Sequence, residues 1–290
     1  MARDITIIIP AFDEADGIVP TIERVKAVTS ANGWDAEIIV VDDGSADETG
    51  ARAASAGVRV IRNPVNGGYG LSLRRGIMAA ESDIVAITDA DGTYPVEDLP
   101  KLFVSVRDGV DMAVGARQGK EYRKGRFKNP ARAIFRIIAE FVAGRKIPDI
   151  NSGLRVMRRD TLLPYLPQTC LGFSFTTSIT LILMLNGHFV TYRPIAYAPR
   201  VGSSKVRHVR DTLRTAQIMT SIIATHNPIK LAIIVDMVAV VAILLAFLAA
   251  WIFPLASAIP VVVAGGLIAT LPVVFMLGCL GEVIRIQRLR

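Results

Sequence analysis

The sequence predicts an α/β protein in which a mostly parallel β-sheet is flanked by helices and is followed by interfacial helices and two C-terminal transmembrane helices. Residues 1–115 alternate strand-like and helix-like segments, which is typical of a parallel sheet covered by helices. The strand-like segments are near-continuous runs of Val and Ile, as expected when both faces of a sheet are buried. Residues 229–253 and 258–280 are apolar blocks, and each exceeds the roughly 20 helical residues that span a bilayer.

The first 115 residues are predicted to contain strands that alternate with helices. In an open parallel sheet the ligand binds beyond the carboxyl ends of the strands. Four polar loops, each after a strand, should therefore converge on one edge: "PAFDE" (10–14), "DDGS" (42–45), "NGGYG" (66–70) and "DADG" (89–92). The predicted strands are 4–9, 36–42, 58–62, 83–88 and 110–115, and the predicted helices are 15–31, 46–56, 68–80 and 96–107.

The second part of the chain is less regular. A basic loop is followed by predicted helices at 131–144 and 173–187, with the stretch "DINSGLRVMRRD" (149–160) between them and a strand at 188–195 after them. The helix at 173–187 is too short to span a bilayer and is predicted to lie in the core. Residues 203–226 have apolar and basic residues at helical spacing, which predicts an interfacial helix on the cytosolic leaflet.

These segments predict three regions: a cytosolic domain at 1–200, an amphipathic interfacial region at 201–227 and a transmembrane hairpin with a basic tail at 228–290. "MARDITIIIP" leads directly into a strand without the pattern of a signal peptide, so the N-terminus is expected in the cytosol. The basic tail "RIQRLR" places the C-terminus there as well, because positive flanks stay inside. The chain has only two cysteines, which suits a reducing compartment.

The formal charge of +7 is concentrated between residues 117 and 159. There 13 Lys and Arg residues stand against Glu121, Glu140 and Asp149. This pattern fits either a solvated face near anionic lipid headgroups or a phosphate-binding surface. A nucleic-acid partner is not expected, since no nucleic-acid-binding motif is present and aromatic residues do not interleave with the basic ones.

Asp89 and Asp91 are separated by one residue at the end of a predicted strand. In an extended segment, residues i and i+2 point to the same side, so both carboxylates can face the expected site. Two such hard oxygen ligands suit Mg²⁺ or Mn²⁺, which usually also binds substrate phosphates. The alternative is a turn in which an Asp side chain caps the backbone.

The other three loops extend the acidic site. Asp43 can accept hydrogen bonds from a nucleotide base or from ribose hydroxyls, whereas Ser45 or Asp47 can also cap the next helix. Pro10, Phe12 and Glu14 follow the first strand. The glycine-rich turn at 66–70 opens a helix, which by itself is weak evidence for a phosphate site.

Together these motifs resemble the family-2 glycosyltransferases, which have the GT-A (Rossmann-like) fold. The matching stretches are P-x-[YF]-[ND]-E at 10–14, V-D-D-G-S-x-D-x-T at 41–49, N-x-G-x-G at 66–70 and D-A-D at 89–91. The resemblance covers roughly residues 4–200. It implies a nucleoside-diphosphate-sugar donor and a metal on the D-x-D carboxylates Asp89 and Asp91. The residues implied in binding the nucleotide sugar are Pro10, Phe12, Glu14, Val41, Asp43, Asp89, Ala90, Asp91 and Arg117. The chain has Phe12 where Tyr is common and Asp13 where Asn is common.

Two later segments resemble the polyprenyl-phosphate glycosyltransferases, the dolichol-phosphate mannosyltransferase group. "DINSGLRVMRRD" is similar to that group's D-x-x-[SC]-G-[FL]-[RK] segment, and "APRVGSSKVR" is similar to its R-x-x-G-x-S-K segment. The resemblance implies transfer of a hexose to a polyprenyl phosphate with inversion of the anomeric carbon. Processive polysaccharide synthases are less similar, because no Q-x-x-R-W stretch occurs. The candidates for binding the lipid phosphate are Arg126, Lys128, Arg132, Ser152, Arg155, Arg200 and Lys205.

Catalytic roles are expected for Arg117, Asp149 and Asp91. Arg117 and a metal on the D-x-D pair can stabilise the leaving diphosphate. Asp149 can orient the attacking phosphate through an arginine, accept a proton, or form a plain salt bridge. The alternatives for the whole chain are transfer to another membrane lipid and a non-catalytic protein that binds nucleotide sugars. The sequence leaves open the identity of the sugar, the choice between UDP and GDP, whether the chain forms a homo-oligomer, and the role of Asp236.

Overall fold

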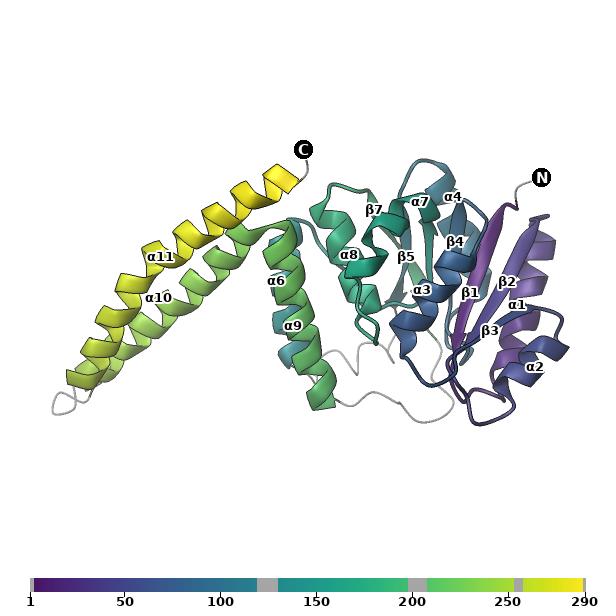
Figure 1. The fold of residues 1–290 in the computed structure, drawn as a ribbon, viewed down its shortest axis with the longest axis horizontal. Coiled ribbons are helices and arrows are strands. Elements are labelled where there is room, and N and C mark those ends of the chain that lie inside the picture. Colours follow the sequence, from purple (N-terminus) through teal and green to yellow (C-terminus); the bar gives the residue numbers. More distant parts are fainter. Residues whose placement is uncertain (1–2, 119–129, 198–207, 253–257, 289–290) are drawn as a thin grey trace. The chain divides into compact units, whose positions relative to one another are not determined.

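The computed structural model describes residues 3–118, 130–197, 208–252 and 258–288. Its centre is a seven-stranded sheet with the strand order β3-β2-β1-β4-β6-β5-β7 (Figure 1). All neighbouring pairs are parallel except those that β6 makes with β4 and β5. The strands are β1 (Ile5–Ala11), β2 (Ala36–Asp42), β3 (Arg59–Arg62), β4 (Ile84–Ile87), β5 (Met112–Gln118), β6 (Arg155–Arg158) and β7 (Val190–Ala196).

Helices cover both faces of this sheet, which explains the apolar strands. All seven residues of β1 are buried, and successive side chains enter opposite layers. Ile7 and Ile9 belong to one core cluster, with residues of α1 and α4, and Ile8 belongs to another, with residues of α3 and α8. The helices of this part are α1 (Ile18–Ala31), α2 (Thr49–Ser55), α3 (Tyr69–Ala79), η1 (Val96–Asp98), α4 (Leu99–Arg107), α6 (Pro130–Ala143), α7 (Arg159–Leu162), η2 (Leu163–Gln168) and α8 (Phe175–Leu185). The predicted mostly parallel α/β class is confirmed, and the helix expected in the core is α8, which is buried from Phe175 to Met184.

Strand β6 was not predicted from the sequence. It lies inside the stretch "DINSGLRVMRRD", for which no strand was predicted, and it separates β4 from β5. Because β6 runs antiparallel, its first residue Arg155 pairs with Ile87 at the end of β4 and with Val114 of β5. The residues that precede β6 therefore arrive at the edge where the parallel strands end.

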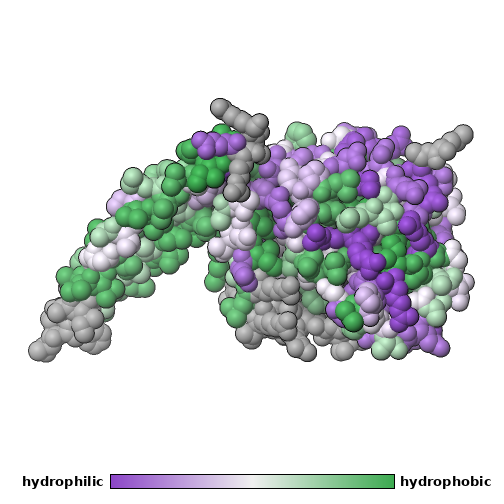
Figure 2. All heavy atoms as spheres, viewed as in Figure 1, coloured by the Kyte–Doolittle hydropathy of each residue, from purple (hydrophilic) through white to green (hydrophobic). Residues whose placement is uncertain are grey.

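The C-terminal unit, Met219–Arg290, is compact in itself. It begins within α9 (His208–His226) and continues with α10 (Pro228–Ile252) and α11 (Ala258–Arg288). Helices 228–252 and 261–287 are long and apolar enough to cross a membrane, with mean hydropathies of 3.0 and 2.3. They pack closely where α11 has a glycine, since a Cβ on Gly278 would lie 2.5 Å from the Cβ of Ala232. Apolar residues dominate the surface of this hairpin (Figure 2), as expected for a pair of membrane spans.

Candidate active site

Side-chain hydrogen bonds link the four loops that follow the parallel strands. The Asp13 amide donates to Ser45 Oγ (3.0 Å), which joins the first loop to the second. Asp43 accepts from the backbone of the glycine-rich turn, which joins the second loop to the third. The Tyr69 hydroxyl donates to Asp89 Oδ1 (2.9 Å), which joins the third to the D-A-D loop. The four loops expected at this edge of the sheet are thus connected by a continuous polar network.

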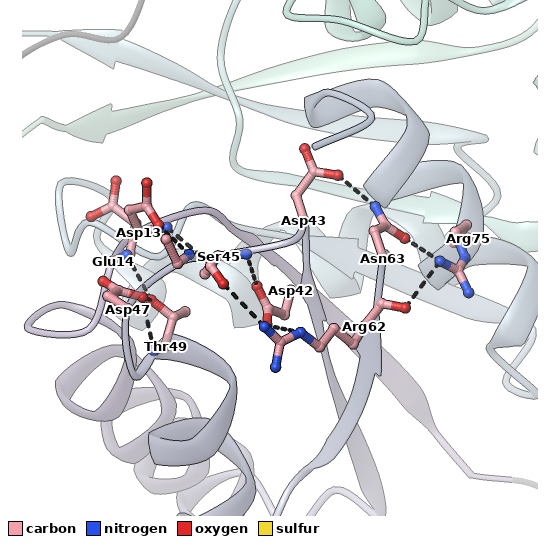
Figure 3. A network of polar contacts seen from close by, with 11 residues as sticks. Asp13, Glu14, Asp42, Asp43, Ser45, Asp47, Thr49, Arg62, Asn63 and Arg75 are labelled. Atoms are coloured by element: carbon pink, nitrogen blue, oxygen red, sulfur yellow. Dashed lines mark hydrogen bonds and ion pairs between the residues drawn. The ribbon is translucent and has the colours of Figure 1, made fainter. Parts of the chain in front are cut away.

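The first loop is shaped by Asp13, which has a φ of +49°. This left-handed conformation is tolerated best by Gly, Asn and Asp, so Asp13 suits a position where the family often has Asn. Asp13 Oδ1 accepts from the Ala46 amide (2.9 Å), and the Glu14 amide donates to Thr49 Oγ1 (2.8 Å) (Figure 3). Asp47 Oδ1 accepts from the Thr49 amide (2.9 Å) at the start of α2, so the capping alternative holds for Asp47.

Asp43 is a buried carboxylate with three N–H donors. Its Oδ1 accepts from the Gly67 amide (3.0 Å) and from Asn63 Nδ2, and its Oδ2 accepts from the Gly68 amide (2.8 Å). Asn63 Oδ1 accepts in turn from Arg75, which fixes the orientation of the Asn63 amide (Figure 3). Asp43 is therefore held rigidly, and it holds the glycine-rich turn in place.

The glycines of that turn allow its backbone to pack closely against residues 170–172. A Cβ on Gly70 would lie 2.1 Å from the Cys170 carbonyl oxygen, and one on Gly68, whose φ is +97°, would lie 2.7 Å from the Leu171 oxygen. The Leu71 amide, in the first turn of α3, donates to the same Leu171 oxygen (2.9 Å). This part of the helix N-terminus is thus occupied by protein backbone.

Asp89 is half-buried and lies against Tyr69 of α3 and against Gly153, which precedes β6. It accepts the Tyr69 hydrogen bond, and a Cβ on Gly153 would lie 2.8 Å from its Oδ1. The Gly153 amide also donates to the Tyr94 hydroxyl (2.7 Å). Burial, followed by the charge of Asp89, raises the pKa of the Tyr69 hydroxyl well above its ordinary value, so Tyr69 remains a donor at neutral pH.

Asp91 lies in a turn. Strand β4 ends at Ile87, so the chain is not extended as far as residue 91, contrary to the expectation from the sequence. Its Oδ1 accepts from the Thr93 amide (3.1 Å) and hydroxyl (2.6 Å), which is the Asp-capped turn named as the alternative. Ala90 is buried between the two acids, and its carbonyl accepts from Thr21 Oγ1 (3.0 Å).

Arg24 on α1 holds the loop that follows Asp91. Its guanidinium donates to the Gly92 carbonyl (3.2 Å), to the Tyr94 carbonyl (3.3 Å) and, from two nitrogens, to Glu97 (2.9 and 2.8 Å). This hydrogen bonding lowers the pKa of Glu97 below its ordinary value. The Arg24 side chain thus donates hydrogen bonds to four acceptor atoms of the segment from Gly92 to Glu97.

Asp149 and Arg117 form a bidentate ion pair. Arg117 donates from Nε to Asp149 Oδ2 (2.6 Å) and from Nη2 to Oδ1 (2.8 Å), and its amide donates to Oδ2 as well (3.1 Å). The Asn151 amide also donates to Oδ1 (3.2 Å). The Arg117 guanidinium carbon lies 5.2 Å from the ring centre of Tyr197. The salt-bridge alternative for Asp149 is therefore what the structure contains.

Arg155 is completely buried, although it was expected to bind a lipid phosphate. Its guanidinium donates to the Ser152 carbonyl (2.7 Å), the Ile150 carbonyl (2.8 Å) and Thr180 Oγ1 (2.6 Å). Burial lowers its pKa. The structure does not bring Arg155 to the surface; it uses this side chain to hold residues 150–152. The buried Ser152 Oγ has no hydrogen-bond partner among the described residues.

The remaining predicted residues divide into two groups. Pro10 pairs in register with Val41, and both are buried, while Phe12 and Glu14 are half-buried beyond the end of β1. Arg126, Lys128, Arg200 and Lys205 lie outside the described residues, as does the side chain of Arg132.

Tyr69, Tyr94, Arg24 and Gly153 were not identified from the sequence as site residues. Tyr94 could have been noticed from its place directly after the D-A-D-G stretch, and Tyr69 from its place in the glycine-rich turn. Arg24 carried no signal, because it is an ordinary charged residue on an amphipathic helix.

Asp89 and Asp91 are the described residues that could hold a divalent cation if a substrate shared it. Among the described residues no group of three His, Cys, Asp or Glu side chains could hold a metal alone. Asp89 and Asp91 together supply hard oxygen ligands, and Mg²⁺ or Mn²⁺ commonly completes such a set with phosphate oxygens and water.

Comparison with known proteins identifies the family of this chain. The sequence model of glycosyl transferase family 2 matches residues 6–164. A dolichyl-phosphate hexose transferase of Haloferax volcanii is 29% identical over 205 residues, which cover 70% of this chain and 86% of the relative. A dolichol-phosphate mannosyltransferase of Pyrococcus furiosus is 29% identical over 54% of this chain, and the match spans about half (47%) of the relative's length.

Solved structures confirm the predicted GT-A fold. Glucosyl-3-phosphoglycerate synthase of Mycobacterium tuberculosis, in complex with Mn²⁺, uridine diphosphate and phosphoglyceric acid, superposes with a TM-score of 0.60. The superposition covers 77% of this chain and 78% of that one at 19% sequence identity. The matched sequence model shows that this chain is a glycosyltransferase and belongs to glycosyl transferase family 2.

Proposed function

We propose that this glycosyltransferase moves a hexose from a UDP- or GDP-sugar to a polyprenyl phosphate at the cytosolic membrane face, with inversion at the anomeric carbon. The observation that carries the proposal is the junction of the D-A-D loop with the segment before β6. Gly153 lies against Asp89, and Asp149 is paired with Arg117 on β5. The dolichyl-phosphate and dolichol-phosphate transferases among the relatives support this acceptor class.

The donor would lie across the carboxyl ends of β1, β2 and β4. Phe12, Glu14 and Asp43 would frame the nucleotide, with Pro10 and Val41 supporting them from the ends of β1 and β2. Asp89 and Asp91 would hold Mg²⁺ or Mn²⁺ against the donor diphosphate, where the cation would stabilise the charge that develops on the leaving group. Solved relatives of this fold contain Mn²⁺ or Mg²⁺ together with uridine diphosphate.

Arg117 would face the same developing charge, because a guanidinium binds phosphate oxygens well. Asp149 is committed to Arg117 and to the Asn151 amide, which favours the role of orienting this arginine over that of a proton acceptor. An oxygen of the lipid phosphate would attack the anomeric carbon as the bond to the diphosphate breaks. That oxygen is largely ionised at neutral pH, so no strong general base is required.

The acceptor phosphate needs donors that hold it near the sugar. Ser152 adjoins Gly153, and its hydroxyl lacks a partner among the described residues; because this hydroxyl is completely buried, it would reach the phosphate only if the side chains that cover it move. The cations for the phosphate would be Arg126, Lys128, Arg132, Arg200 and Lys205. Arg155 would act indirectly by fixing residues 150–152.

A transfer assay in detergent with undecaprenyl phosphate tests this proposal. Radiolabelled UDP-glucose, UDP-N-acetylglucosamine and GDP-mannose would be supplied in turn, and label in the organic phase would be counted. We expect label with one donor, and only when polyprenyl phosphate is present. Transfer to dioleoylglycerol instead would contradict the acceptor, and donor binding without any transfer would contradict turnover.

A further inference from the structure

Tyr94 is a buried tyrosine that follows the D-A-D loop, where several elements of the site meet. It is 3% exposed, although Asp91 precedes it by only three residues. The Arg24 guanidinium donates to the Tyr94 carbonyl (3.3 Å), which fixes the main chain at this position. Burial, the largest effect, raises the pKa of the Tyr94 hydroxyl above its ordinary value, so the hydroxyl stays protonated at neutral pH. Tyr94 is therefore a neutral side chain held in one place.

The Tyr94 hydroxyl joins the D-A-D loop to residues 149–153, the segment before β6. It accepts a hydrogen bond from the Gly153 amide (2.7 Å), which lies 59 residues away along the chain. Gly153 also lies against Asp89, since a Cβ on Gly153 would come within 2.8 Å of Asp89 Oδ1. The two parts of the site thus meet at Gly153 through a close backbone approach and a hydrogen bond.

The Tyr94 ring reaches the ion pair at the other end of the same segment. It packs edge-on against the Tyr197 ring, with the ring centres 5.4 Å apart. The Arg117 guanidinium carbon lies 5.2 Å from the centre of the Tyr197 ring, which is within the range of a cation–π contact. Arg117 is in turn paired with Asp149. One tyrosine therefore contacts Gly153 directly and the Arg117–Asp149 pair through Tyr197.

We propose that Tyr94 is a positioning residue that couples occupation of the D-A-D loop to the order of residues 149–153, a role that rests on the proposed function. A cation and a donor diphosphate bound at Asp89 and Asp91 would fix the loop, and the Tyr94 hydroxyl would then hold the Gly153 amide in place. A segment that is already ordered binds its ligand more tightly, because less conformational freedom is lost on binding. The acceptor phosphate would therefore bind best after the donor.

The substitution Tyr94→Phe tests this coupling, because it keeps the ring and removes the hydroxyl. Tyr165→Phe is the matched control, since it removes a hydroxyl that contacts His188 (3.2 Å). His188 in turn lies 3.5 Å from Asp111, which precedes the start of β5, so the control lies at the opposite end of that strand from Arg117.

Two measurements on the full chain in detergent would be combined. Hydrogen–deuterium exchange would be followed with Mn²⁺ and uridine diphosphate, and then with Mn²⁺ and guanosine diphosphate, beside calorimetry that shows which nucleotide binds. Steady-state transfer to undecaprenyl phosphate would give KM and kcat separately, which distinguishes weaker acceptor binding from slower chemistry.

In the wild type and in Tyr165→Phe, the bound nucleotide should lower deuterium uptake in residues 88–97 and also in residues 149–157. In Tyr94→Phe we expect the protection of 88–97 to persist and that of 149–157 to be lost. Nucleotide affinity in the absence of acceptor should stay at the wild-type level. The KM for undecaprenyl phosphate should rise several-fold with little change in kcat.

Protection of 149–157 that persists in Tyr94→Phe, or that is absent from the wild type, would overturn the coupling while transfer by the wild type still supports the proposed function. Loss of protection in both segments would overturn it too, because the hydroxyl would then support the loop itself. Protection that depends on Tyr94 without any transfer by the wild type would support the coupling and contradict the proposed acceptor. Binding of neither nucleotide would overturn both.

Discussion

Asp149 is a nearly buried carboxylate that fixes the orientation of the neighbouring Arg117 guanidinium. Two guanidinium nitrogens and two amides of this chain donate to it, and its side chain is 2% exposed. The removal of one partner of such a buried pair leaves a charge without compensation, which is costly in a low-dielectric site. The pair therefore contributes to stability as well as to the proposed function.

The substitution Asp149→Asn should lower the free energy of unfolding by about 3 kcal/mol, because it removes the buried carboxylate charge that compensates the Arg117 guanidinium. It should also abolish most of the transfer activity. Denaturant unfolding of the full chain in detergent would measure the first effect. The control Lys101→Gln removes an exposed ion pair to Asp98 and should cost less than about 1 kcal/mol. Equal stability of the two variants would contradict this role for the pair.

Arg24→Gln should weaken metal activation without removing a metal ligand, because the loop from Gly92 to Glu97 loses four hydrogen bonds. We expect the apparent activation constant for Mn²⁺ to rise several-fold, while Lys101→Gln leaves it unchanged. A rise in the KM for the donor alone, with unchanged metal dependence, would contradict a role in holding the Asp91 loop.

The Arg24–Glu97 contact also has a defined pH dependence. The pKa of Glu97 is lowered in the folded state, so the contact stabilises the loop fully above the unfolded pKa of Glu97. This stabilisation is lost as the pH falls through the lower, folded value. Thermal unfolding of the wild type should therefore lose more stability than that of Arg24→Gln between neutral pH and a pH below the folded pKa of Glu97. Parallel curves for the two proteins would contradict this linkage.

At the scale of elements, the start of α3 depends on its contact with residues 170–172. Gly70→Ala would place a Cβ 2.1 Å from the Cys170 oxygen, a backbone atom that cannot swing away. Overpacking of this kind costs about 1–3 kcal/mol. Gly57→Ala is the control, since its Cβ would meet nothing within 4 Å and only its φ of +72° opposes it. Chemical denaturation should show the larger loss for Gly70→Ala, and the reverse order would be inconsistent with the observed packing.

The same scale shows what the sequence could predict. The strands β1, β2 and β4 were predictable because each is an apolar run that ends in a recognisable polar loop. Strand β6 was not, because its four residues, Arg155–Arg158, have arginine at both ends and no apolar alternation. Its burial comes from β4 and β5, which lie more than 35 residues away along the chain.

The site was predictable to a similar degree. The motifs indicated which acidic residues gather at the sheet edge, because parallel strands end there together. The partners of those residues depend on tertiary contacts, such as Arg117 with Asp149 at a separation of 32 residues. A sequence likewise does not distinguish the buried Arg155 from an arginine that meets a phosphate, since both carry the same charge.

At the scale of the whole molecule, the apolar helices α10 and α11 suggest a hairpin that leaves both chain ends on one side of the membrane. A fluorescent protein fused after Arg290 should fluoresce, and alkaline phosphatase inserted at residue 255 should be active in a bacterial host. The basic tail and the positive-inside tendency predict this orientation. An active phosphatase after Arg290 would contradict the cytosolic placement of the C-terminus.

Asp89 and Asp91 are proposed to hold a cation at which sugar transfer occurs. The most direct measurement is sugar transfer to polyprenyl phosphate, titrated with Mn²⁺ and Mg²⁺, for the wild type, Asp91→Asn and the surface control Asp98→Asn. We predict that chelation abolishes wild-type transfer, that Asp91→Asn loses about 100-fold or more in kcat, and that Asp98→Asn matches the wild type. Wild-type activity that persists in chelator, or full activity of Asp91→Asn, would contradict the account.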